Sequence, residues 1–443
     1  MAKKKELSPE ERLEAALVPK EEWLYEVPGN WCWVYLTKGC AECKDSYRKP
    51  INATERAGRM GDIPYYGATG QVGWIDDFLT DEELVLLGED GAPFLELLKD
   101  KAYLISGKAW VNNHAHILKS FFGHIGNLYL VNYLNIFNFT GYVNGTTRLK
   151  LTQSTMDTIP VPLPPLPEQH RIVSRIESLF AKLDEAKEAA QAVVDGLEDR
   201  KAAILHKAFT GELTKEWRKQ PEHPSFRKSV SIKSVCKSLK YGTGSKSVPK
   251  GSIAVIRMGN LQDGEIDWSN LVYSNNEVDN QKYRLSDGDV LFNRTNSAEH
   301  VGKTAIYRGD YPAIYAGYLI KLDYDQSMIM GDYLNYLLNG PEAKEYCNMV
   351  KTDAVNQSNI NAQKIGAFEI PLIGMDEQKE VVRVIHNVIN QDSAAKESAE
   401  SVLDQIDTMK KSILARAFRG ELGTNDIQDE SAVELLKRVL SSG

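Results

Sequence analysis

Apolar side chains recur at spacings of four and three along two stretches of this chain, one after Glu168 and one after Glu377. Arg200 interrupts the first series and Asp392 interrupts the second. The series are Ile172, Ile176, Leu179, Leu183, Ala186, Ala190, Val193, Leu197 and Ile204, and then Val381, Ile385, Val388, Ala395, Ala399, Val402, Ile406, Met409 and Ile413. Sustained a/d spacing is typical of coiled coils. It predicts two long helices that pack antiparallel on each other, with homodimeric pairing to a second chain as the alternative.

The two helical stretches are copies of one another. Residues 167–213 align without a gap on residues 376–422, with 18 identities in 47 positions. Each copy ends in Gly-Glu-Leu, at Gly211 and Gly420, and glycine is a natural helix stop. The proline-rich segment 162–167 predicts an extended lead-in to the first helix, whereas the second lead-in lacks the proline pair. A period of 209 residues is too long for a solenoid, so it predicts two large half-molecules related by a pseudo-twofold axis.

The segments outside these helices alternate short β-branched and aromatic runs with turn residues. We therefore predict an α+β protein, with two globular mixed α/β domains separated by the two helices. A polar linker, residues 214–226, leads into the second half, and a short amphipathic helix is expected around Val433, Leu436 and Leu440. The predicted divisions are 1–160 (first globular domain with an N-terminal helical segment), 161–214 (first helix region), 215–370 (second globular domain), 371–423 (second helix region) and 424–443 (C-terminal tail).

Composition narrows the class of protein. Of 443 residues, 42% are hydrophobic and 26% charged, which is ordinary for globular protein. No apolar run approaches the roughly 20 residues needed to cross a bilayer. The charged N-terminus does not resemble a signal peptide, and five cysteines form too sparse a set for a secreted disulfide scaffold. We expect a cytoplasmic protein without a membrane partner.

The charge is distributed unevenly along the chain. The formal net charge is −8, yet residues 101–156 and 223–262 contain no Asp or Glu. The first window holds five Lys/Arg and three His, and the second holds eight Lys/Arg. A buried apolar stretch explains part of the first window. Binding of duplex DNA needs only a local positive face, so both windows are candidates for nucleic-acid contact.

Motifs for catalysis are missing from the sequence. Gly302-Lys303-Thr304 ends like a phosphate-binding loop, but Ser297 stands where the first glycine belongs. Cys32, Cys40 and Cys43 lack a further ligand pair at zinc spacing, and His114 and His116 lack an evident third ligand. Serine-hydrolase, zinc-protease and adenine-methyltransferase motifs do not occur either. We therefore predict a binding module without a catalytic or metal site.

Polar loops provide candidate DNA contacts, because amide, hydroxyl and cationic side chains suit base edges and phosphates. A solvated turn is the alternative for each loop taken alone. In the first half the candidates are Tyr65, Tyr66, Thr69, Lys108, Asn112, Asn113, His114, Thr147 and Arg148. In the second half they are Tyr241, Thr243, Ser245, Lys246, Arg257, Asn260, Asn293, Arg294, Thr295, Asn296 and Lys303.

These features together resemble a known family, the specificity subunits of Type I restriction–modification systems. The resemblance rests on the lead-in 159–169, on the helix ending 208–213, and on their second copy, 370–378 and 417–422. Segments 63–70, 258–260, 288–296 and 301–304 are similar to parts of the family's target recognition domains. The resemblance to this family covers nearly the whole chain.

The resemblance implies a non-catalytic reader of double-stranded DNA. Each globular domain would bind one half-site, and the helices, each roughly 60 Å long, would set the spacer between half-sites. Two methyltransferase subunits would bring S-adenosylmethionine, and motor–nuclease subunits would bring ATP hydrolysis with magnesium. A homodimeric DNA-binding regulator and a single-chain restriction–methylation enzyme remain the alternatives.

Overall fold

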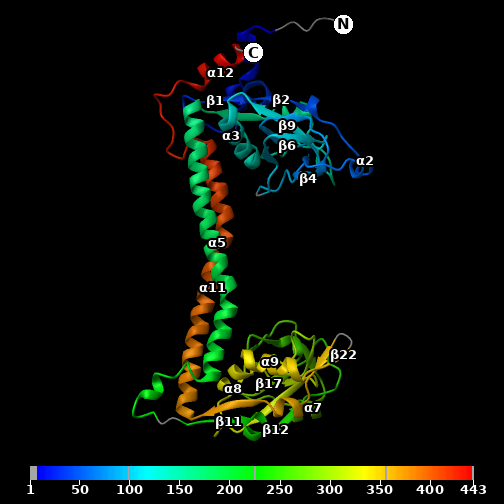
Figure 1. Cartoon of the computed structure of the whole chain (residues 1–443), viewed down its shortest axis with the longest axis vertical. Coiled ribbons are helices and arrows are strands. Elements are labelled where there is room, and N and C mark those ends of the chain that lie inside the picture. Colours follow the sequence, from blue (N-terminus) through cyan, green and yellow to red (C-terminus); the bar gives the residue numbers. More distant parts are fainter. Residues whose placement is uncertain (1–6, 98, 224–225, 355–356, 442–443) are drawn as a thin grey trace. The chain divides into compact units, whose positions relative to one another are not determined.

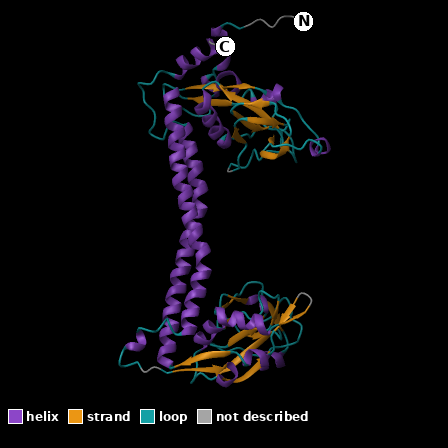
Figure 2. Cartoon of the chain, in the orientation of Figure 1, coloured by secondary structure: helices purple, strands orange, loops and turns teal. Residues whose placement is uncertain are grey.

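A computed structural model describes residues 7–97, 99–223, 226–354 and 357–441 (Figure 1). Residues 1–6 of the expected N-terminal helical segment and residues 224–225 of the expected linker lie outside the described ranges. The chain divides into two compact units, one formed by residues 1–191 with 400–443 and the other by residues 192–399. Both units mix helices and strands, which confirms the predicted α+β class (Figure 2).

The first unit contains two four-stranded sheets and a two-stranded ribbon, with strand orders β2-β9-β6-β7, β4-β3-β8-β5 and β1-β10. The strands are β1 (Cys32–Tyr35), β2 (Ala41–Cys43), β3 (Ile63–Gly67), β4 (Gly70–Ile75), β5 (Thr80–Asp81), β6 (Leu84–Gly88), β7 (Ala102–Ile105), β8 (Lys108–Val111), β9 (Ala115–Ser120) and β10 (Pro160–Leu163). Most pairs are antiparallel, but β3 and β8 run parallel, with Tyr65 opposite Trp110. Because these two strands run parallel, their carboxyl-terminal ends lie on the same side of the sheet.

Helices cover these sheets and close the first unit. They are α1 (Pro9–Ala16), α2 (Ala53–Ala57), α3 (Gly123–Ile136), α4 (Gln153–Met156) and α12 (Ala432–Ser441). Helix α3 packs on β6, β7 and β9. Helix α12 confirms the amphipathic segment expected near the C-terminus, with Leu436 fully buried. The Ala432 N–H donates to Asn30 O at 2.9 Å, so residues predicted as a separate tail are built into the first unit.

The second unit is built on a six-stranded sheet of order β12-β21-β17-β19-β15-β14. Smaller sheets, β16-β13-β20 and β18-β23-β22, and the ribbon β11-β24 complete it. The strands are β11 (Arg227–Ser231), β12 (Cys236–Tyr241), β13 (Ile253–Ile256), β14 (Leu261–Gln262), β15 (Glu265–Ile266), β16 (Val272–Ser274), β17 (Val290–Asn293), β18 (Thr295–Asn296), β19 (Thr304–Ile306), β20 (Ala313–Tyr315), β21 (Leu319–Tyr324), β22 (Thr352–Ala354), β23 (Gln357–Asn359) and β24 (Glu369–Ile373).

The helices of the second unit are short apart from the two long ones. They are α6 (Ile232–Val235), α7 (Glu277–Lys282), α8 (Gly331–Asn339), α9 (Pro341–Val350) and α10 (Ala362–Gly366). Helix α8 packs on β17 and β19 and contributes Tyr333 and Leu334, both fully buried, to the main core of this unit. That core also takes Leu205 from α5 and Ile385 from α11, so the globular part and the long helices share one apolar interior.

The two predicted long helices are α5 (Leu166–Thr210) and α11 (Met375–Phe418). Within each unit their segments run antiparallel. In the first unit Lys410 Nζ lies 2.6 Å from Asp184 Oδ1, and in the second Arg200 Nη1 lies 2.9 Å from Asp392 Oδ1. The two residues that interrupt the heptad series therefore form an ion pair with each other. The Arg200 side chain is 63% exposed, so this ion pair marks the register of the two segments and contributes little to stability.

The apolar side chains of the two heptad series are less buried than their periodicity predicts. Ile172, Ile176, Ile385 and Ile406 are buried, but Val193, Val402 and Met409 are 41%, 41% and 45% exposed. Ala186 is exposed as well. Two helices bury only a narrow stripe between them, so residues at the flanks of each stripe stay in contact with solvent.

The first lead-in segment is extended, as predicted, and both lead-in segments are strands. Strand β10 pairs with β1, and β24 pairs with β11 in the same antiparallel way, with Pro162 and Pro371 at equivalent positions. Tyrosine hydroxyls anchor both, from Tyr129 to Pro162 O at 2.6 Å and from Tyr333 to Pro371 O at 2.9 Å. One detail is corrected: α5 already begins at Leu166, because a proline in the first helical turn loses no hydrogen bond.

The repeated Glu-Gln and Gly-Glu-Leu signatures meet in space, each with the copy from the other half of the sequence. Glu168 and Glu377 are 0% and 2% exposed. Thr424 Oγ1 donates to Glu168 Oε1 at 2.6 Å, and Thr214 Oγ1 donates to Glu377 Oε1 at 2.6 Å. Thr424 and Thr214 follow the two Gly-Glu-Leu stops, whose glycines have φ of +72° and +83°. The sequence identity between the copies thus reflects a shared helix-docking contact.

Candidate DNA-binding surface

A cleft of about 570 Å³ in the second unit gathers candidate residues from distant parts of the sequence. It is lined by Thr243, Gly244, Ser245, Lys246, Ser247, Arg257, Arg294, Thr295, Ala316, Gly317, Tyr318 and Asn359. Six of the residues predicted as DNA contacts are in this set. Gly317, Tyr318 and Asn359 were missed, because nothing in their local sequence distinguishes them from ordinary turn and strand residues.

The loop after β12 is held in place by a carboxylate on α7. Thr243 Oγ1 and Ser245 Oγ both donate to Asp279 Oδ2, at 2.5 and 2.6 Å. These hydrogen bonds keep the pKa of Asp279 below its ordinary value. A Cβ on Gly242 would lie 2.2 Å from Tyr315 O, so only glycine allows the loop to approach β20 this closely. Asp279 therefore bonds two hydroxyls of this loop, and the side chain of Lys246 in the same loop is exposed.

The cleft is positively charged. Lys246, Arg257 and Arg294 line it, and no carboxylate does. Within the described ranges, none of these three cations forms an ion pair. The Nε atoms of Arg257 and Arg294 are buried without a protein hydrogen-bond partner. An arrangement of unpaired cations and hydroxyls in one cleft is suited to a ligand rich in hydrogen-bond acceptors.

Other candidates of the second half lie outside the cleft or inside the fold. Asn260 is 3% exposed, and its amide donates to Asp267 O at 2.9 Å. Asn293 is fully buried and donates to His300 O at 3.3 Å. Both shape loops and are corrected from contact residues to supporting residues. Lys303 Nζ bonds to Gln262 Oε1 at 2.8 Å outside the cleft, and Asn296 pairs with Ser358 on β23.

In the first unit, candidate residues meet around the carboxylate of Asp90. His114 Nδ1 lies 2.7 Å from Asp90 Oδ1, and Arg148 Nη2 lies 2.5 Å from the same oxygen. Asn112 Oδ1 accepts from the His114 N–H at 2.8 Å, and the Asn112 N–H donates to Tyr66 O at 3.1 Å. Residues from β3, β8 and the loop before α4 therefore form one polar cluster.

The remaining candidates of the first unit are dispersed. Tyr65 is 1% exposed and packs in the interior, so it is corrected to a core residue. Lys108 lies at the start of β8, the opposite end of the strand from Asn112, with its ammonium 4.7 Å from the centroid of the Phe78 ring. Thr69, Asn113 and Thr147 are exposed on loops, where they remain candidate contacts.

His114 and His116 lie in different surroundings although they are alternate residues. His114 precedes β9, whereas His116 is fully buried, with Nδ1 2.6 Å from Asp45 Oδ2 and Nε2 3.0 Å from Leu151 O. Asp45, Glu89 and His116 are close enough together to hold an ion. Arg48 bonds both carboxylates, however, so the cluster is already charge-compensated. Burial would raise the pKa of Asp45, but hydrogen bonds and charge from His116 and Arg48 lower it overall.

The five cysteines are free in the structure. Burial raises the pKa of Cys32 to about 12 and that of Cys43 to about 11. Cys32 and Cys40 are buried, and neither forms a disulfide.

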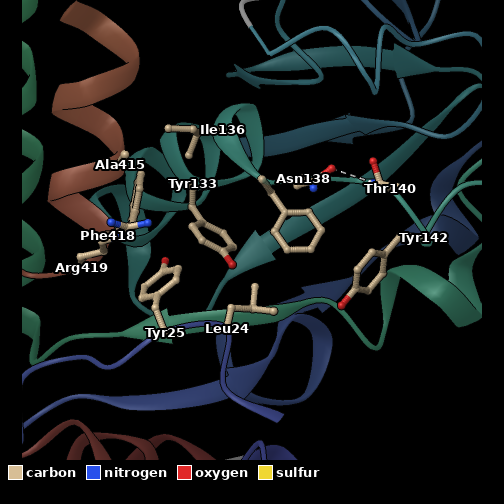
Figure 3. Close-up of a pocket in the computed structure, with 11 residues that line it drawn as sticks. Leu24, Tyr25, Tyr133, Ile136, Asn138, Thr140, Tyr142, Ala415, Phe418 and Arg419 are labelled. Atoms are coloured by element: carbon tan, nitrogen blue, oxygen red, sulfur yellow. Dashed lines mark hydrogen bonds between the residues drawn. The ribbon is translucent and has the colours of Figure 1, made fainter.

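A second cavity, of about 380 Å³, lies in the first unit and has a different character (Figure 3). Its walls are largely aromatic, with Tyr25, Tyr133 and Phe418 among them. In the lining of this cavity, the guanidinium carbon of Arg419 lies 5.3 Å from the centroid of the Tyr25 ring. It contains none of the predicted DNA contacts, so the basic cleft and the Asp90 cluster are the candidate interface.

Comparison with known proteins agrees with this architecture. The family described as Type I restriction modification DNA specificity domain matches residues 47–193 and 225–403. The chain belongs to this family. Among curated relatives, the specificity subunit of the Type I restriction enzyme EcoKI from Escherichia coli K12 is 28% identical over 276 residues, 61% of this chain and 59% of the relative. The EcoDI specificity subunit of Escherichia coli is 24% identical over 386 residues, 82% and 83% of the two chains.

Two solved structures share the fold. The HsdS subunit from Thermoanaerobacter tengcongensis superposes with a TM-score of 0.59 at 18% identity, over 90% of this chain and 100% of that one. A chain from a study of assembly and conformational transition in a type I restriction–modification system gives 0.61 at 17% identity, with the same coverage. Across the described ranges, no helix is long and apolar enough to span a membrane.

Proposed function

We propose that this chain is the DNA-specificity subunit of a Type I restriction–modification complex. Each unit binds one half-site of a bipartite duplex target, and partner subunits methylate or cut the DNA. The observation that carries the proposal is the doubling: two units, each matched by the specificity-domain family, each built on a lead-in strand and a long helix docked through Glu168 or Glu377.

The charge of the candidate surface supports DNA as the ligand. Lys246, Arg257 and Arg294 line one cleft without an ion pair among the described residues, and Arg148 and His114 lie together beside Asp90 in the other unit. Phosphate contacts supply most of the affinity for duplex DNA, and side-chain forks in the grooves supply specificity. The net charge of −8 is compatible with this role, because the acidic residues lie largely outside the cleft.

The exposed apolar residues of the long helices support protein partners. Val193, Val402 and Met409 are apolar side chains of the long helices that are 41–45% exposed. Helices from two methyltransferase subunits would bury such positions. In this proposal S-adenosylmethionine belongs to those subunits, ATP and magnesium belong to motor–nuclease subunits, and this chain performs no catalysis.

Reconstitution tests the proposal. The purified chain alone should neither methylate nor cut DNA, whereas the chain with its modification subunits and S-adenosylmethionine should methylate one bipartite sequence, read by methylome sequencing. The modification subunits without this chain are the control and should show no sequence preference. Methyl transfer by the isolated chain, or methylation without sequence preference by the full complex, would contradict the proposal.

A further inference from the structure

Arg294 stands in the cleft of the second unit on a rigid support. Its N–H donates to Tyr318 O at 3.0 Å, and its carbonyl accepts from the Ile360 N–H at 2.8 Å, so the backbone is held on both sides. Its side chain is half-buried, unlike that of Lys246 in the same cleft, which is exposed. The residue is therefore presented by the sheet edge rather than by a free loop.

The guanidinium group is also fixed in orientation. Its central carbon lies 4.9 Å from the centroid of the Tyr241 ring, and Nη1 donates to Gly317 O at 3.3 Å. The Tyr241 hydroxyl in turn accepts from the Ala362 N–H at 2.9 Å, which anchors the ring. A planar fork stacked on an anchored ring has lost most of its rotational freedom before a ligand arrives, so little further entropy is lost on binding.

The donors that remain on Arg294 are unsatisfied. Nε is buried without a protein partner, and the second Nη1 hydrogen and both Nη2 hydrogens have no acceptor among the described residues. A buried cationic donor without a partner is costly, and such a group in a native fold requires an explanation. The neighbouring cations Lys246 and Arg257 are donors as well, so this part of the cleft suits a ligand that is rich in acceptors.

Two classes of acceptor suit a fixed fork. A phosphate presents two adjacent oxygens, and the exposed Lys246 in the same cleft already provides a cation for it. Among base edges in the major groove, guanine alone presents two adjacent acceptors, O6 and N7. Adenine presents an acceptor beside an amino donor, and that donor would face the donors of Arg294.

We propose that Arg294 reads a guanine in the half-site bound by the second unit and that Tyr241 is the residue that positions it. This inference rests on the proposed function and adds the identity of one base to it. The half-site of the second unit therefore contains at least one guanine contacted at O6 and N7.

The test measures how tightly the complex of the full chain with its modification subunits binds DNA duplexes. The duplexes carry the bipartite sequence that this complex methylates. Each guanine of both half-sites is replaced in turn by 7-deazaguanine, which lacks the N7 acceptor but keeps Watson–Crick pairing. For one guanine the replacement should weaken binding about 5- to 150-fold, the range that corresponds to about 1–3 kcal/mol for a bidentate contact. Arg294→Ala should weaken the ordinary duplex similarly and should abolish sensitivity to 7-deazaguanine at that position.

Matched variants separate reading from charge and folding. Arg284 is an exposed arginine of the same unit that does not line the cleft, so Arg284→Ala should keep the sensitivity to 7-deazaguanine. Arg294→Met keeps the aliphatic stem and removes every donor, so it should also lose the sensitivity, which carries the test if the alanine variant misfolds. Tyr241→Ala should reduce the preference for guanine over adenine without changing the salt dependence of binding, whereas Tyr241→Phe should retain the preference.

The outcomes are distinguishable. If the complex shows no sequence-specific binding, the proposed function itself fails. In the alternative outcome, the complex binds and methylates a bipartite site, while both Arg294 variants remain as sensitive to every 7-deazaguanine replacement as the unmodified chain. That result overturns the guanine assignment and leaves the proposed function standing.

Discussion

Thr214 carries the sharpest stability prediction, because its hydroxyl is buried against a charged group. It is 2% exposed, donates to Glu377 Oε1 at 2.6 Å, and accepts from Arg218 Nη1 at 2.8 Å. Glu377 Oε2 already lacks a protein partner. Thr214→Val keeps the shape and removes the hydroxyl, so the carboxylate keeps only its bond from Arg218. Hydrogen bonds to charged groups contribute about 1.5–3 kcal/mol, and we expect a loss of about 2 kcal/mol.

Hydrogen exchange by mass spectrometry measures this loss locally, which suits a chain of two units where a single unfolding transition is not assured. A loss of about 2 kcal/mol should raise exchange in the segment 211–219 roughly 30-fold. Thr210→Val is the matched control, because the Thr210 hydroxyl is exposed and bonds only to carbonyls of its own helix. Equal changes in the two variants would show that the Thr214–Glu377 contact does not stabilise the docked helix end.

Three further predictions concern charge, pH and spacing. Lys246→Ala should weaken binding to all duplexes alike and reduce the salt-dependence slope by about one, measured by fluorescence anisotropy; an altered base preference would contradict a phosphate contact. Burial raises the pKa of Glu168 above its ordinary 4.5, so the folded state binds the proton more tightly and stability should fall as pH rises above 4.5 until the raised pKa is passed. Glu168→Gln should remove that slope in denaturant melts. Deleting Ala186–Ala192 together with Ala395–Ser401 removes about 10 Å of rise from each helix, and methylome sequencing should show both half-sites with a spacer about three base pairs shorter; an unchanged spacer would mean that the helices do not set it.

The long helices and the duplication were predictable because their signals are local and repeated. Heptad spacing depends only on the order of residues, and the terminal glycines mark where a helix ends. The same reasoning could not show that Arg200 and Asp392, each an interruption in its own series, pair with one another at 2.9 Å. That pairing depends on how two segments nearly 200 residues apart are aligned with each other. Neither series by itself carries this information.

The candidate site was predictable only in part. Residue type selected Lys246 and Arg294 as candidate DNA contacts, because cationic side chains in loops suit DNA, and both line the cleft. Residue type also favoured Asn293 and Asn260, whose amides the fold uses to hold its own loops. An asparagine that bonds backbone carbonyls and one that faces a ligand look alike in sequence, since both follow a strand and precede a turn.

The sequence alone therefore determined the class of the fold, the two halves, the long helices with their ends, and the acid-free windows, which follow from composition, short-range periodicity and the 209-residue repeat. Only the tertiary structure decided which polar side chains share a cleft, that Asp279 and Asp90 anchor the loops around them, and that each Glu-Gln signature docks against the threonine from the opposite half. The physical reason is distance along the chain. Periodicity reports which face of an element is buried, whereas a site is assembled from elements whose mutual placement is decided by packing and hydrogen bonding across the whole unit.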